Sequence, residues 1–402
     1  MFVTLALVAA AALALSGIAA GWVVSRNSRT LDDAREQGLE LATSVTDFRT
    51  LLARADARAA TTLIAGGLED TEERAQYDQD ILEASRALTE AGLVARPADR
   101  EDISALSSGL VEYAGLVETS RANSRLGYPV GSAYLNQARD LANDELVPRA
   151  ERLRREGERR IAQAANSVGG PVGALAIVLL VGALVVLVGC ALLIAGRTRR
   201  IAHPALVAAT VVIIGALVVV VQAITAQSRE LRAAATGDID AYVAANTAAS
   251  TLSNLRVTEI SAVAARGSGG PLYEQFATDA EGLQSGLAEA PGDPEGIEEL
   301  DASAATYIEA VGEVQAADEA GDNREAAALA QSDSENSAGS AGAYEAANDL
   351  ALENVDREAA DLADRFDAAG DADIHPLVPI ALGGLAALLA AAGTLARGRK
   401  YR

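Results

Sequence analysis

The stretch that decides the fold is Val172–Ala195, which reads VGALAIVLLVGALVVLVGCALLIA. Three further runs share its apolar character, namely Phe2–Val24, Ala205–Ala226 and Leu377–Leu395. None of the four runs contains an Asp, Glu, Lys or Arg residue. An apolar helix of about 20 residues is long enough to cross the ~30 Å hydrocarbon core of a bilayer. The sequence therefore predicts an integral membrane protein with four transmembrane helices.

The first run has an alternative interpretation as a cleaved secretory signal, with a cleavage site near Ala19-Ala20-Gly21. However, Met1-Phe2-Val3-Thr4 lacks the basic residues that begin a signal peptide, and the apolar run is longer than a usual signal core. We therefore favour a transmembrane helix that is retained.

Composition and charge exclude several classes of protein. The chain has 402 residues, a net charge of −23 and 50% hydrophobic residues, and the apolar runs hold much of that hydrophobicity, which excludes a single soluble globule. The acidity argues against a nucleic-acid partner. Residues 227–375 carry a net charge of −24 against −7 for residues 27–168, so the second long segment suits a basic partner better than the first.

Basic residues in the short segments predict the orientation in the membrane. The link Gly196–His203 contains three Arg residues, and the tail Arg397–Arg402 contains four basic residues. Short basic segments stay on the cytoplasmic side, so both termini are expected inside and both long segments outside. Several Arg residues between Arg149 and Arg160 oppose this orientation, but long segments cross the membrane largely regardless of charge.

The long segment after the first run is predicted to be helical. Its apolar residues recur every three or four positions, which is typical of a heptad seam: Leu41, Val45, Phe48, Leu52, Ala55, Ala59 and Leu63. Breaks are expected at Gly66-Gly67, Ala91–Pro97 and Gly127–Gly131. The last helix is expected to run from about Ser132 into the second span, with a kink at Pro148. Four helices with short connections predict a four-helix bundle.

The second long segment has the same organisation. Breaks are expected at Gly267–Pro271, Pro291–Gly296 and Ala320–Asn323, and Ser332–Gly342 is a weak point in the fourth helix. The segments also resemble each other at an offset of 209 residues, where Ala138, Asp140, Leu141 and Ala142 match Ala347, Asp349, Leu350 and Ala351. A repeated order of span, bundle and span predicts a duplicated unit.

No catalytic motif is present in the sequence. We found no phosphate-binding loop, no dinucleotide glycine fingerprint, no HExxH and no GxSxG. The two His residues, His203 and His375, each precede a Pro at the start of a span. We therefore expect no enzyme activity, no catalytic residues, no cofactor and no metal. Transport is also weakly supported, because the spans lack ionisable residues.

Small residues in the spans allow two interpretations. Gly17 and Gly21 form a Gly-xxx-Gly pair in the first span, and Gly182 and Gly189 are one heptad apart in the second. Such residues allow close contact between membrane helices, which predicts a packed bundle of spans. The alternative is apolar filler without a specific contact.

Charged residues near the seams are the candidate ligand-binding residues. Arg256 and Glu259 fall at core-type positions of the second bundle, and Arg54 and Arg58 flank the seam of the first at a corresponding height. Because a buried charge is costly unless it is paired or holds a ligand, these four residues could form an anion-binding site between the bundles. The alternative is a set of salt-bridged or solvated helix charges.

The order of span, long helix, three more helices and span resembles the four-helix-bundle sensor domains of bacterial chemoreceptors and histidine kinases. The stretch Ala317–Ala328 is similar to the turn between the third and fourth helices of that family. A difference is that the cytoplasmic parts expected here are only an eight-residue link and a six-residue tail. The tandem of two units resembles the actinobacterial GlnX family, with Tyr128–Leu135 and Glu145–Ala150 as the nearest local likeness. That resemblance implies a relay from a GlnH-type binding lipoprotein outside to a PknG-type Ser/Thr kinase inside.

The sequence thus predicts an all-α membrane sensor, and the resemblance implies that its signal is a small amino acid or a ligand-loaded binding lipoprotein. The alternatives are a scaffold of the cell envelope and an accessory subunit of a transporter, and the oligomeric state stays open. The expected divisions are spans at 1–24, 172–195, 205–226 and 377–395, outer bundles at 25–171 and 227–376, a cytoplasmic link at 196–204 and a tail at 396–402.

Overall fold

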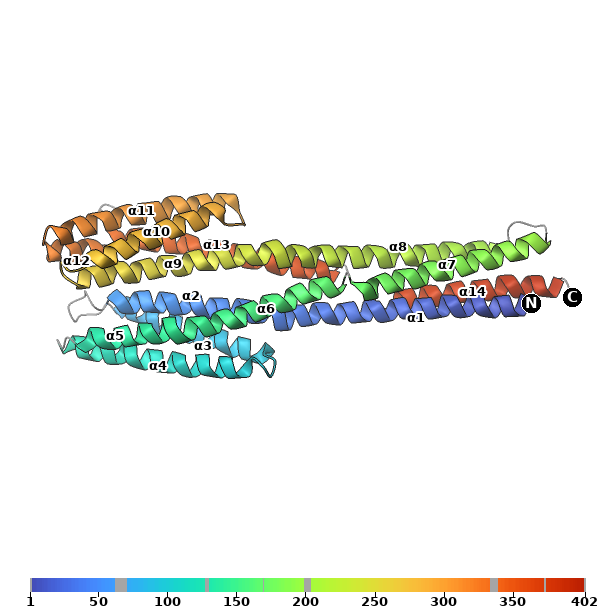
Figure 1. The fold of residues 1–402 in the computed structure, drawn as a ribbon, viewed down its shortest axis with the longest axis horizontal. Helices are drawn as coiled ribbons and strands as arrows, with labels where there is room; N and C mark the ends of the chain where they lie inside the picture. The colour runs from blue at the N-terminus through green and yellow to red at the C-terminus, as the bar shows by residue number, and fades with distance from the viewer. Residues whose placement is uncertain are drawn as a thin grey trace. The chain divides into compact units, whose positions relative to one another are not determined.

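The computed structural model describes residues 2–61, 71–126, 130–168, 170–198, 204–332, 339–371 and 374–400. These residues form helices joined by turns, and none of them lies in a β-strand (Figure 1). The all-α fold class is therefore confirmed. The chain divides into two compact units, one made of Met1–Arg35, Ile161–Ala234 and Asp364–Arg402, the other of Glu36–Arg160 and Ala235–Ala363.

The first unit contains the four apolar runs as helices. They are α1 (Phe2–Ala34), α7 (Pro171–Thr198), α8 (Pro204–Ala233) and α14 (Leu377–Lys400). Within the described residues, four helices are long and apolar enough to cross a membrane, as predicted. Their inner faces share one cluster that includes Leu13, Leu180 and Ile213, whereas large apolar side chains such as Leu15 and Leu388 are exposed. An apolar outer surface is what lipid contact requires.

The small residues of the first span mediate a close helix contact, and those of the second do not. A Cβ atom added at Gly17 of α1 would lie 2.8 Å from the Cα atom of Gly383 in α14, and one at Gly383 would lie 2.7 Å from the Cα atom of Gly17. By contrast, a Cβ atom at Gly182 or Gly189 would meet nothing within 4 Å. The predicted close packing is confirmed for Gly17 of α1 and wrong for Gly182 and Gly189 of α7, because these two glycines do not face a neighbouring helix among the described residues.

The second unit consists of two halves, which are called here the first half (Glu36–Arg160) and the second half (Ala235–Ala363). The helices of the first half are α2 (Glu40–Thr61), α3 (Thr71–Val94), α4 (Arg100–Arg125), α5 (Val130–Leu141) and α6 (Val147–Val168). They share one hydrophobic cluster. The predicted seam from Leu41 to Ala59 is buried in that cluster, which confirms the heptad pattern up to Ala59; Leu63 lies outside the described residues.

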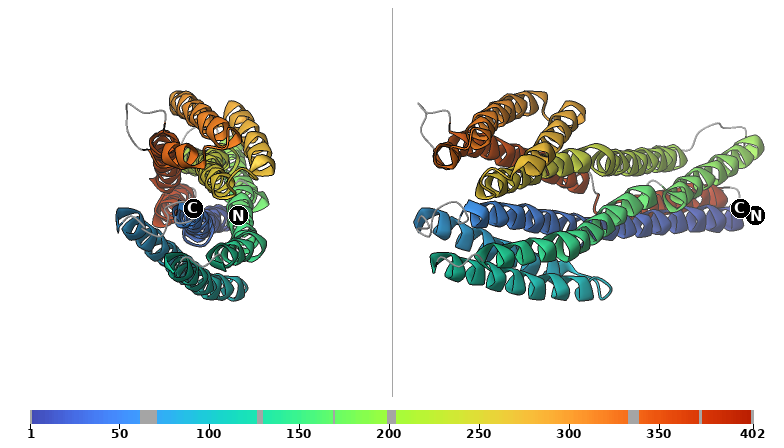
Figure 2. Two further views of the ribbon diagram at one scale, coloured as in Figure 1. Left: turned by 90° about the vertical axis from the view of Figure 1, so that its left-hand side faces the viewer. Right: turned by 60° about the vertical axis from the view of Figure 1, so that its left-hand side comes forward.

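The helices of the second half end where Gly and Pro were expected to break them. They are α9 (Ile239–Ala264), α10 (Gly270–Glu289), α11 (Pro294–Glu319), α12 (Asn323–Gln331) and α13 (Ser340–Asp371). Asp293 caps α11 by accepting hydrogen bonds from the backbone N–H groups of Glu295 and Gly296, and Asp322 caps α12 in the same way through Glu325. Figure 2 shows both sets of helices, the first from blue to green and the second from yellow to red.

One expectation about the last helix of the first half is corrected. It does not run unbroken into the second span, because α6 ends at Val168 and α7 begins at Pro171. Pro171 lacks a backbone N–H group and restricts the preceding residue, Gly170, which ends a helix. At Pro148 the chain stays helical, and a π-helical turn, η2 (Ala142–Leu146), precedes the proline. The extra residue of that turn accommodates the missing hydrogen bond.

Further π-helical turns lie at η1 (Arg35–Leu39) and η3 (Ala234–Asp238). Near η1, helix α6 approaches closely, because a Cβ atom at Gly157 would lie 2.6 Å from the carbonyl oxygen of Gly38. The expected breaks at Gly66-Gly67 and at 127–129 lie outside the described residues, as do residues 333–338 of the weak point Ser332–Gly342. Helix α13 begins at Ser340, within that stretch.

Substitution at Gly17 should therefore destabilise the first unit. Gly17→Val introduces a side chain where Gly383 already lies in contact, and overpacking of this kind costs about 1–3 kcal/mol. The matched variant Gly182→Val adds the same side chain at a site with open space, so its unfolding midpoint should equal that of the wild type. Thermal unfolding of the purified chain in detergent measures both, and equal midpoints for the two variants would contradict the α1–α14 contact.

Candidate functional site

Buried polar side chains join the two halves where α2 lies against α9. The Thr50 hydroxyl donates to Asn246 Oδ1 at 3.0 Å and lies 3.4 Å from Ser250 Oγ, and all three residues are buried. One turn earlier, the Tyr242 hydroxyl donates to Asp47 Oδ1 at 2.7 Å. Buried polar groups are stable only when their hydrogen bonds are satisfied. These contacts therefore fix which residues of α2 and α9 face each other.

Asp47 is a titratable member of this interface. Burial raises the pKa of the Asp47 carboxyl, because the charged form loses its hydration. The hydrogen bond from Tyr242 lowers it by a smaller amount, since it stabilises the carboxylate. The contact between the halves thus contains a group whose charge is sensitive to pH.

Arg139 of α5 makes a second connection between the halves. Its guanidinium donates to Asp56 Oδ2 at 3.2 Å within the first half and to Ser261 Oγ at 3.0 Å in the second half. The other oxygen of Asp56 accepts from the Tyr113 hydroxyl at 3.0 Å. Burial raises the pKa of Asp56, and the charge of Arg139 opposes that rise.

The predicted residues of the first half, Arg54 and Arg58, are held by one carboxylate of α3. Arg54 Nη2 lies 3.1 Å from Asp80 Oδ1, and Arg58 Nε lies 2.9 Å from Asp80 Oδ2. Arg58 also lies 3.5 Å from Glu73. The positive charges of this pair are therefore met by carboxylates of the neighbouring helix.

The predicted residues of the second half, Arg256 and Glu259, are buried and paired with each other. Arg256 is 5% exposed and Glu259 is 0% exposed, which confirms the core-type positions. Arg256 Nη1 lies 2.7 Å from Glu259 Oε2, and Nη2 donates to the carbonyl oxygen of Ala330 at 2.7 Å. The hydroxyl of Tyr307 donates to Glu259 at 2.9 Å, and Ser340 contacts both charged groups. The pair has the full set of partners that a buried ion pair needs.

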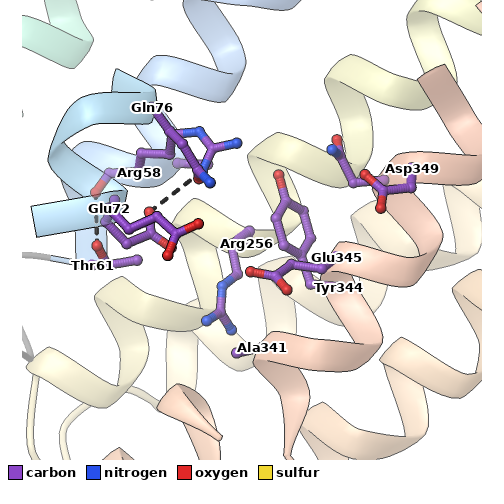
Figure 3. Close-up of a pocket in the computed structure, with 12 residues that line it drawn as sticks. Arg58, Thr61, Glu72, Gln76, Arg256, Ala341, Tyr344, Glu345 and Asp349 are labelled. Atoms are coloured by element: carbon purple, nitrogen blue, oxygen red, sulfur yellow. Dashed lines mark hydrogen bonds and ion pairs between the residues drawn. The ribbon is translucent and has the colours of Figure 1, made fainter. Parts of the chain in front are cut away.

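A pocket of about 360 Å³ lies between the halves. Helices α2, α3, α9 and α13 line it with Ala57, Arg58, Thr61, Glu72, Glu73, Gln76, Arg256, Ala341, Tyr344, Glu345, Asn348 and Asp349. Figure 3 shows Arg58, Glu72 and Gln76 on one side and Tyr344, Glu345 and Asp349 on the other. Of the four predicted residues, Arg58 and Arg256 line this pocket, and Arg54 and Glu259 do not. Arg54 shares the Asp80 carboxylate with Arg58, and Glu259 is paired with Arg256.

Sequence reasoning missed the contribution of α13. Five of its residues face the pocket at spacings of three, four, seven and eight positions from the first: Ala341, Tyr344, Glu345, Asn348 and Asp349. That spacing is one face of a helix. Polar residues that recur on one face of an alanine-rich helix are a sequence signal for a functional surface. Only the fold shows that this face of α13 lines a pocket together with α2 and α3. Among the residues that the structure describes, no group of three or more His, Cys, Asp or Glu side chains is placed to hold a metal ion.

The comparison with protein families gives one match. Residues 30–166 match the family model of an actinobacterial sensor domain. The matched segment covers α2 to α6, the helices that form the first half. No curated protein and no solved structure matches the chain. A sensor role is thus supported for the part of the chain that contributes Arg58, Glu73 and Gln76 to the pocket.

Removing one partner of the buried pair should destabilise the second half strongly. Arg256→Met leaves the Glu259 carboxylate buried without its cation, which costs about 3–5 kcal/mol. Arg152→Met removes an arginine that is half exposed and lies 3.1 Å from Asp102, and loss of such an exposed pair costs about 0–1 kcal/mol. Chemical unfolding of the two variants and the wild type measures the difference. Equal losses would show that the Arg256–Glu259 pair is not buried as described.

The carboxyl of Asp47 should make the stability of the protein depend on pH. Because its pKa is raised in the folded chain, its stabilising contribution is complete below the unfolded value of about 3.9 and is lost as pH rises through the folded pKa. The unfolding free energy of the wild type minus that of Asp47→Asn should therefore fall as pH rises from about 4 to the folded pKa. In a Tyr242→Phe background the fall should begin at the same pH and continue to a higher pH, since the hydrogen bond that lowers the folded pKa is gone. A difference that stays constant across this range would contradict the assignment.

Proposed function

We propose that this protein is a transmembrane sensor that passes a signal from outside the cell to a cytoplasmic partner. The observation that carries the proposal is the match of residues 30–166 to an actinobacterial sensor domain, in a chain with four helices apolar enough to span a membrane. The basic link and tail are the cytoplasmic parts. The segments 25–171 and 227–376 are the extracytoplasmic four-helix bundles, and the role is binding and relay rather than catalysis.

The signal in this proposal is a small amino acid or a GlnH-type lipoprotein loaded with its ligand. Two features favour recognition by the second unit: the pocket lies between its halves, and the halves differ strongly in charge. A ligand that contacts both halves stabilises one arrangement of them over another, which is the condition for a ligand to shift a conformational equilibrium.

The relay in this proposal runs along helices that continue from the apolar runs. Helical residues follow one another without a break from Phe2 to Thr61 and from Pro204 to Ala264. A shift of α2 against α9 is thereby coupled through the chain to α1 and α8. The cytoplasmic ends then change their contacts with a Ser/Thr kinase of the PknG type.

The proposal is tested in cells that carry the gene, a deletion of it, or the deletion complemented. Addition of amino acids to the medium should raise the activity of the cytoplasmic kinase in the wild type and the complemented strain, and not in the deletion strain. A reporter fused to the C-terminus should give a cytoplasmic signal. A kinase response that is unchanged by the deletion, or an extracytoplasmic C-terminus, would contradict the proposal.

A further inference from the structure

Asn348 lines the pocket and carries an unsatisfied hydrogen-bond acceptor. The residue is 6% exposed, it lines the pocket between the halves, and its buried Oδ1 atom has no hydrogen-bond partner. Leaving such an atom buried without a donor costs free energy. Since the residue lines a space of about 360 Å³, a small molecule bound there is a source of the donor that this atom lacks.

The charges around the pocket favour a cationic donor. Its lining contains four carboxylates, those of Glu72, Glu73, Glu345 and Asp349, and two guanidiniums. Arg58 is paired with Asp80 outside the lining and with Glu73 in it, and Arg256 is paired with Glu259 outside the lining. The carboxylates in and next to the lining therefore outnumber the guanidiniums, and this excess of negative charge favours a positive charge in the pocket.

Two neighbours of Asn348 in α13 also line the pocket. Asp349 is the next residue of α13, and Tyr344 lies one turn earlier on the same helix face. A carboxylate pairs with an ammonium group by a charge-assisted hydrogen bond, and an aromatic ring attracts a cation to its face. The volume of the pocket lies within the roughly 300–1,000 Å³ that is typical of small-molecule sites.

We propose that this pocket binds a small solute through a protonated primary amino group, which donates to Asn348 Oδ1 and pairs with the carboxylate of Asp349. The inference rests on the proposed sensor function and names the chemistry of its ligand. The ammonium group belongs either to an amino acid or to a simple amine, and the experiment distinguishes the two sources.

The test is calorimetric titration of the full chain, purified in detergent, with four probes. Lysine and glutamine are amino acids, putrescine is an amine without a carboxylate, and succinate is a dicarboxylate without an amino group. Binding of lysine or glutamine but not putrescine identifies an amino acid as the source, and binding of putrescine identifies the amine. Succinate should not bind. Binding of succinate as tightly as the amino compounds, or no binding of any amino compound at millimolar concentration, would overturn the proposal.

Variants of the two contact residues make the test specific to this pocket. Asn348→Leu removes the acceptor at similar volume, and Asp349→Asn removes the exposed carboxylate with little risk to folding. Each should weaken binding of the amino compound by about tenfold or more, the range for a hydrogen bond to a charged group. The matched control is Glu309→Gln, which removes an exposed carboxylate of α11 outside the pocket lining and should leave binding unchanged. Unchanged binding in Asp349→Asn would contradict the assignment.

The outcome separates this inference from the sensor proposal. If the amino compound binds and the two variants weaken it, the ligand site stands even when the kinase does not respond in cells. If the kinase responds to amino acids while the purified chain binds none of the amino probes, the sensor function stands and the ligand site is refuted.

Discussion

The pairing of α2 with α9 through buried polar side chains is the contact on which the second unit depends. Thr50, Asn246 and Ser250 are removed from water, and the hydrogen bond from Thr50 across the two helices satisfies the buried Oδ1 atom of Asn246. Apolar faces alone would tolerate sliding of one helix past another, whereas a polar layer fixes the register. Because α2 and α9 each belong to the core of their own half, this layer sets how the two halves meet and creates the pocket between them.

Within each half, charges near the seam are satisfied locally. Arg58 is held by Asp80 of the adjacent helix, and Arg256 is held by Glu259 one turn along the same helix. In each pair the guanidinium lines the pocket, and its partner carboxylate lies outside the pocket lining. The carboxylates of α3 and α13 outnumber these guanidiniums in the pocket lining, which is why the proposed ligand is an amine and not the anion expected from the sequence.

Much of the fold could be predicted because its signals are local. The seam from Leu41 to Ala59 follows from spacings of three and four, and the ends of α9, α10 and α11 follow from Gly and Pro residues. The core positions of Arg256 and Glu259 follow from the register of one helix. These features need only the periodicity of a single segment.

Features that depend on packing between distant segments could not be predicted. The polar layer joins residues about 200 positions apart, and the pocket needs residues of α2 and α3 to face a stripe of α13. The glycines of α7 show the same limit, since a close contact requires a partner helix as well as small residues. The end of α6 before Pro171 has a local signal in Gly169-Gly170-Pro171, but the long apolar run that follows favours a continuous helix.

The most direct test of the account is a disulfide cross-link between α2 and α9. Cys190 is the chain's one cysteine, so Cys190→Ser gives a background in which Thr50→Cys and Ser250→Cys can be combined. The two hydroxyl oxygens lie 3.4 Å apart, so the cysteines should oxidise rapidly within one chain. The control pair Thr50→Cys with Thr247→Cys places the second thiol on the exposed side of α9 and should not cross-link within the chain. A disulfide that forms only between chains, or in neither pair, would contradict the pairing of α2 with α9.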